Sequence, residues 1–157
     1  MRPVTMAYNT AEARQELLDD VAAATDQIAV ALAALGDAYE QLDEQNADRL
    51  EEELFRPVQM AYGRAKRTHD GFADRHGLPR RAFEPGSAGL PSNGVKGFVA
   101  RAVEAVGAAD SGLATLQDSM RPVEVGDAEL RAGLSEVRRL IGNVPGRATG
   151  FVRLLGR

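Results

Sequence analysis

Residues 11–44 read AEARQELLDDVAAATDQIAVALAALGDAYEQLDE, and this stretch decides the fold class. Its apolar side chains recur at steps of three and four residues, at Leu17, Leu18, Val21, Ala24, Ile28, Leu32, Leu35, Tyr39 and Leu42. That spacing places them along one face of an α-helix. The opposite face carries mostly carboxylates, with few cations four residues away to offset their repulsion. We therefore expect a long amphipathic helix whose acidic outer face lies near basic residues of another segment.

Three further segments show helical spacing, at residues 47–76, 95–120 and 128–141, the last preceded by Asp127 as a good N-cap. Pro57 interrupts the first of these segments, so it should either kink a helix or lie in a first turn. The geometries to consider are a kinked second helix packed antiparallel to the first, which we favour, and one interrupted rod from residue 11 onward. The sequence predicts an all-α, antiparallel bundle of about four main helices in a single domain, residues 1–157.

Three segments fall outside the predicted helices. Residues 1–9 are expected to form an arm, with Asn9 as N-cap and Glu12 closing a capping box. Residues 77–94 hold three prolines and four glycines, which predicts a long loop. Its Leu78, Phe83 and Leu90 favour a loop packed on the bundle over a free linker. Residues 145–157 are expected to form a short, basic, amphipathic appendage.

The tripeptide Arg-Pro-Val occurs three times, beginning at Arg2, Arg56 and Arg121. The first two copies continue alike, so that Tyr8 corresponds to Tyr62 and Met6 to Met60. One interpretation is a pair of related pockets; the simpler one, which we favour, is similar packing on a common core. The arginines before the prolines are candidates to cap helix C-termini or to pair with the acidic face.

Composition argues against most catalytic chemistry. The chain has no cysteine, which excludes disulfides, thiolate metal sites and a cysteine nucleophile. His69 and His76 stand about 10.5 Å apart along a helix, too far to share one metal ion without other ligands. Glu51, Glu52 and Glu53 point in different directions, and no phosphate-binding glycine loop is present. We expect no metal, no cofactor and, on balance, no enzyme.

The longest uninterrupted apolar run has eight residues, so we expect no membrane span and a cytoplasmic protein.

Charge is distributed unevenly along the chain. Residues 1–55 carry a net charge of −10 and residues 56–157 a net charge of +6. We favour an acidic helix lying against basic ones over a face for nucleic acid or membrane. The basic tail could dock on its own bundle or another subunit, lie on an anionic membrane, or touch nucleic acid. The candidate partner-binding residues are Arg138, Arg139, Arg147, Phe151, Arg153, Leu154 and Arg157.

Three functional hypotheses follow from these patterns. The first is a non-catalytic interaction or scaffold protein that self-associates or binds a protein partner. The second is a peripheral binder of anionic membrane or nucleic acid, using the basic second half. The third is a small-molecule-binding bundle with a candidate pocket formed by Tyr8, Tyr62, His69 and the 77–94 loop.

Overall fold

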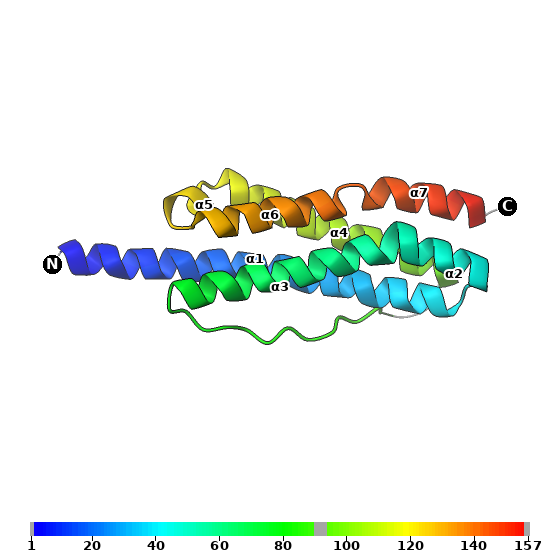
Figure 1. Cartoon of the computed structure of the whole chain (residues 1–157), viewed down its shortest axis with the longest axis horizontal. Helices are drawn as coiled ribbons and strands as arrows, with labels where there is room; N and C mark the ends of the chain where they lie inside the picture. The colour runs from blue at the N-terminus through cyan, green and yellow to red at the C-terminus, as the bar shows by residue number, and fades with distance from the viewer. Residues whose placement is uncertain (1, 90–93, 156–157) are drawn as a thin grey trace.

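The computed structural model describes residues 2–89 and 94–155, with side chains from residue 9 onward. Its elements are α1 (Arg2–Glu40), α2 (Glu44–Leu50), the π-helical turn η1 (Glu51–Phe55), α3 (Arg56–Arg75), α4 (Gly94–Asp118), α5 (Arg121–Glu124), α6 (Ala128–Ile141) and α7 (Val144–Leu155). They form four columns: α1, the consecutive α2–η1–α3, α4, and α6 followed by α7 (Figure 1). This arrangement confirms the predicted all-α antiparallel bundle.

The direction of α4 explains the long connection that precedes it. Helix α1 packs antiparallel to both α3 and α4, and α3 packs antiparallel to α6 (Figure 1). Helices α3 and α4 therefore run the same way, and the chain must return along the bundle between them. The 25 residues of α4 span about 37 Å, which a tight turn cannot cross, whereas 18 extended residues reach roughly 60 Å.

The core is built mainly from leucine and alanine. The largest fully buried side chains are Phe72, Phe151, Leu17, Leu18, Ile28, Leu35, Leu50, Leu54, Leu113, Leu116, Leu130 and Leu134. Small side chains such as Ala31, Ala34 and Ala109 are also fully buried, on the extensively packed α1 and α4. Each large side chain removed from water stabilises the folded state by about 1.5–3 kcal/mol. The stability of the bundle therefore depends on this core more than on helix propensity.

Pro57 is accommodated by a local change in helix type. As a proline it has no N–H to donate to the carbonyl of Glu53, four residues back. The turn before it is π-helical, and the Arg56 N–H donates to the carbonyl of Glu51, five residues back. The chain thus passes from α2 into α3 with a widened turn, and Pro57 lies in the first turn of α3. Of the two predicted effects of this proline, the place in a first turn is present, in a segment that runs antiparallel to α1.

The predicted N-terminal arm is wrong, whereas the predicted C-terminal amphipathic segment is present. Helix α1 begins at Arg2, so residues 2–9 are not an arm and Asn9 is not an N-cap; asparagine is tolerated within a helix at small cost. The basic amphipathic segment predicted from residue 145 is part of helix α7, which buries Val144, Ala148 and Phe151 and so docks on its own bundle, one of the positions expected for it. This helix packs against α4 and η1, and the Arg49 guanidinium lies 5.0 Å from the centroid of the Phe151 ring.

Helix α1 also bears on the membrane prediction. Its Asn9–Glu40 part is long and apolar enough to cross a membrane by length and composition, which the count of uninterrupted apolar residues did not reveal. Of the most apolar window, 56% is buried inside the bundle. A buried core helix passes the same test, so the structure is compatible with a soluble protein.

Candidate interaction surface

The acidic face of α1 is partly neutralised within the bundle, as predicted. The Arg81 guanidinium donates two hydrogen bonds of 2.8 Å to the Asp26 carboxylate. Arg121, from the third Arg-Pro-Val copy, pairs with Asp20 and, at 3.8 Å, with Glu16. Arg121 therefore pairs with the acidic face of α1, which is one of the two roles expected for the arginines of these tripeptides.

One end of the α3–α6 pair is fixed by a cluster around Asp127. This carboxylate caps α6 by accepting from the Leu130 N–H at 2.8 Å, and it accepts two hydrogen bonds from Arg75 at 2.8 and 2.9 Å. His76 Nε2 lies 3.0 Å from the same carboxylate. The Arg75 guanidinium, helped by the Leu130 N–H and His76, holds the pKa of Asp127 far below its usual range. Asp127 is thus a structural anion rather than a general acid.

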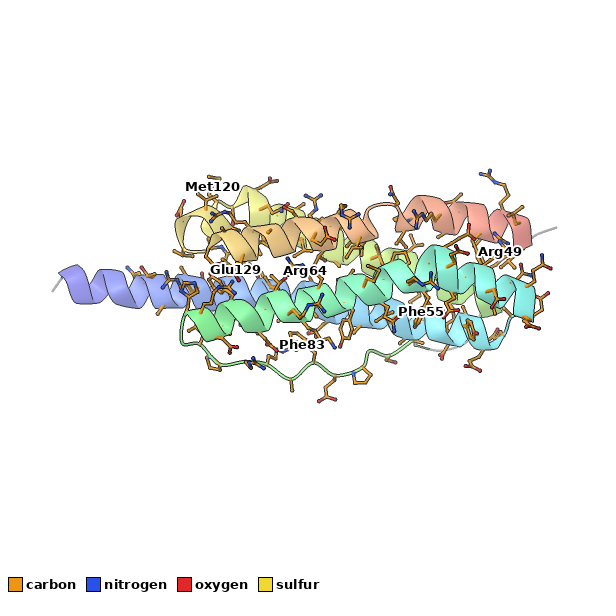
Figure 2. All side chains as sticks on the ribbon, in the orientation of Figure 1. Arg49, Phe55, Arg64, Phe83, Met120 and Glu129 are labelled. Atoms are coloured by element: carbon orange, nitrogen blue, oxygen red, sulfur yellow. The ribbon has the colours of Figure 1, made fainter. Side chains whose placement is uncertain are left out.

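Farther along, α3 and α6 border an open groove of about 540 Å³. The groove is lined by Met60, Gly63, Arg64 and Arg67 of α3, and by Glu136 and Leu140 of α6. The side chain of Met60 is 53% exposed. In Figure 2 the Arg64 side chain lies between the ribbons of the two helices. An exposed apolar side chain beside cations is a common composition for a protein contact.

The charges in this groove are unequally satisfied. Glu136 accepts hydrogen bonds from Arg139 at 2.9 and 2.6 Å, and this guanidinium lowers the pKa of Glu136. Within the described part of the chain, the side chains of Arg64 and Arg67 make no hydrogen bond or ion pair. The groove therefore presents two guanidinium groups that are not hydrogen-bonded to described residues, although Arg64 contributes, after Arg139, to lowering the pKa of Glu136.

An exposed line of residues continues from this groove toward η1. We call Glu52, Arg56, Met60, Arg64 and Arg67 the α3 ridge; Glu51 is not part of it, because it borders α1. The carboxylate of Glu52 is exposed, as are Arg56 and Arg67. Glu52 and Arg64 are separated by about 18 Å along the helix axis. The ridge thus begins with a carboxylate at Glu52 and ends with two guanidinium groups at Arg64 and Arg67, with Arg56 and Met60 between them.

The partner-binding residues predicted from the tail do not form one surface. Arg138 donates to Asp110 at 2.8 Å and to Gln117 at 2.9 Å, both on α4, while Arg139 pairs with Glu136. Phe151 is fully buried, which corrects its assignment as a partner contact. The exposed members that the structure describes are Arg139, Arg147, Arg153 and Leu154; Arg157 lies outside the described residues.

The predicted pocket is also divided. Tyr62 lines a hollow together with Ala29 of α1. Tyr8 lies 21 residues before Ala29 on the same helix, which is a distance of about 30 Å along the helix axis. Tyr8 and Tyr62 therefore do not share a pocket. The side chain of Tyr8 lies outside the described ones. His69 is 3% exposed; its Nδ1 lies 3.0 Å from Asp70 Oδ1, and its ring meets the Phe83 ring edge-on at 5.2 Å. His69 therefore packs the loop against the bundle.

No group of three or more metal-ligating side chains suited to a metal ion occurs in residues 2–89 and 94–155. Comparison of the chain with protein-family models, curated proteins and solved structures found no match. Function must therefore be argued from the surfaces of the molecule.

Proposed function

We propose that this chain is a non-catalytic interaction protein that pairs with a second copy of itself through the α3 ridge. The observation that supports the proposal is the placement of opposite charges at the two ends of the ridge, with Glu52 at one end and Arg64 and Arg67 at the other. A surface of this kind is complementary to itself when two copies meet antiparallel. The bundle is compatible with a soluble protein, and we propose that it acts in the cytoplasm.

The expected geometry follows from two-fold symmetry. In such a pair, if residue i of one copy contacts residue j of the other, then j also contacts i. With the axis near residue 58, Glu52 of each copy faces Arg64 of the other, and Met60 faces the aliphatic part of Arg56. Every contact then forms twice, whereas a parallel arrangement would place like charges together.

The charges on the ridge also determine the expected affinity of the dimer. Exposed ion pairs contribute roughly 0.2–1 kcal/mol each and weaken as salt screens them. A few such pairs around two methionines should give a weak dimer that depends on concentration and salt. The tail is a weaker candidate for the interface, because Arg138 and Arg139 already have carboxylate partners and Phe151 is buried.

The test is light-scattering mass at low and high salt, with folding checked by circular dichroism. We expect the wild-type chain to be a dimer at low salt, and Arg64→Glu/Arg67→Glu and Glu52→Arg each to be monomers. An equal mixture of the two variants should recover the dimer, because their charges are again complementary. Arg147→Glu/Arg153→Glu, on α7, is the matched control and should behave as wild type.

Two results would overturn the proposal. The first is a wild-type chain that stays monomeric at high protein concentration and low salt, because such a chain does not self-associate. A dimer that survives both ridge variants but is lost in the α7 control would place the interface on the tail instead.

A further inference from the structure

A second hollow, of about 400 Å³, lies on the side of α3 that faces α1. Its walls are Ala29, Leu32 and Ala33 of α1, Tyr62 and Lys66 of α3, and Phe83 of the connecting segment, residues 76–89. Figure 2 shows Phe83 between this segment and the helices. The lining residues are distinct from those of the α3 ridge.

The outer wall of the hollow is held in place by several contacts. Arg81 binds Asp26 of α1 with two hydrogen bonds, and Arg80 binds Asp74 at 2.9 and 2.7 Å. The backbone of Gly86 passes so close to α1 that an added Cβ would lie 2.5 Å from the carbonyl carbon of Ala29. The connecting segment is thus fitted to the bundle and gives the hollow a defined shape.

The hollow combines apolar walls with two polar groups. The Lys66 ammonium lies 4.3 Å from the centroid of the Tyr62 ring and has no carboxylate partner among the described residues. The Tyr62 hydroxyl makes no hydrogen bond within the same part of the chain. Burial, and then the Asp26 carboxylate, raise the pKa of Tyr62, so its hydroxyl remains protonated and can donate.

The charge balance at this site favours an anion. Two carboxylates act on Tyr62: Asp26, which is already bound by Arg81, and Glu84, which is exposed on the connecting segment. Neither lines the hollow, whereas Lys66 does and is the one charged side chain among the described residues that line it. Small-molecule sites of roughly 300–1,000 Å³ commonly have this composition, with mostly apolar walls and a few polar groups that orient the ligand.

We infer that the hollow binds a small amphiphilic anion, its carboxylate or sulfonate held by Lys66 and Tyr62 and its apolar body against Leu32, Ala33 and Phe83. The inference does not depend on self-association, because it uses the opposite side of α3.

The probe is 8-anilinonaphthalene-1-sulfonate, titrated by fluorescence into the folded full-length chain. Its neutral counterpart, N-phenyl-1-naphthylamine, lacks the sulfonate and reports apolar contact alone. We expect one sulfonate site per chain, with affinity roughly tenfold lower in Lys66→Met, since a charge-assisted hydrogen bond is lost. The matched control is Lys96→Met, at an exposed lysine of α4, which should leave the affinity unchanged. Ala33→Leu, which narrows the hollow, should weaken both probes.

Three outcomes would contradict the inference. One is the absence of sulfonate binding to the folded wild-type chain. Another is binding that is equally strong in Lys66→Met, which would remove the anion-binding role of this lysine. The third is binding that Ala33→Leu leaves unchanged, which would place the probe elsewhere on the molecule.

Discussion

Substituting Gly133 by alanine tests the close approach of α3 and α6. An added Cβ at Gly133 would lie 2.2 Å from Thr68 Oγ1, 2.7 Å from its Cγ2 and 2.9 Å from its Cβ. Rotating the Thr68 side chain cannot relieve the last contact, because Cβ is fixed to the backbone. The helices must therefore shift, and overpacking of this kind costs about 1–3 kcal/mol. Alanine also gains about 0.8–1 kcal/mol of helix propensity over glycine, which partly hides that cost.

A second glycine separates the two effects. Gly112 of α4 is exposed, and nothing lies within 4 Å of a Cβ added there, so Gly112→Ala should gain the propensity alone. In urea unfolding followed by circular dichroism, Gly133→Ala should be less stable than Gly112→Ala by about 1–3 kcal/mol. Adding Thr68→Ala to Gly133→Ala should recover part of the loss. Equal stability of the two glycine variants would refute the close approach.

Three further substitutions test other parts of the structure. Asp127→Ala should lower the free energy of unfolding by about 1–2 kcal/mol at neutral pH, since α6 loses its N-cap. Because the folded-state pKa of Asp127 is lowered, urea unfolding between pH 7 and 2 should show this difference in full above pH of about 4 and shrinking below it. Gly86→Ala should speed tryptic cleavage after Arg80 or Arg81 while the helices stay folded, because its Cβ overlaps the α1 backbone. Met120, an exposed residue with φ of 69°, adopts a left-handed conformation, so Met120→Gly should raise the free energy of unfolding by about 1 kcal/mol in thermal scans.

Helical periodicity predicted the fold class because a helix with one apolar face can be read from neighbouring residues. Helix ends were less predictable. Asn9 is a good N-cap residue, but it costs little inside a helix, so the local sequence did not decide between the two. The tail was predicted as a short basic amphipathic segment, but its sequence left open whether it would lie on its own bundle, another subunit, a membrane or nucleic acid. The burial of Val144, Ala148 and Phe151 shows that it packs on its own bundle.

The candidate surfaces were harder to predict, because ion pairing is decided in three dimensions. Arg138 is satisfied by Asp110, 28 residues away on another helix, and nothing in the local sequence of the tail shows this. The ridge did leave a signal. Arg56, Met60 and Arg67 lie opposite the apolar stripe of Val58, Ala61 and Ala65, with carboxylates just before them. That signal identifies an outer face, but it does not show which cations on the face lack partners.

The two proposed surfaces differ because of the path of the chain. Since α3 and α4 run in the same direction, the connection between them returns along the outside of the bundle and covers the groove between α1 and α3 (Figure 1). The groove between α3 and α6 has no such cover. One side of α3 therefore borders a hollow suited to a small ligand, and the other remains open to a protein. The surfaces should then respond independently: Lys66→Met should leave the mass in solution unchanged, and Arg64→Glu/Arg67→Glu should leave sulfonate affinity unchanged. A variant that altered both properties would indicate a change in the position of α3 itself, which borders both surfaces.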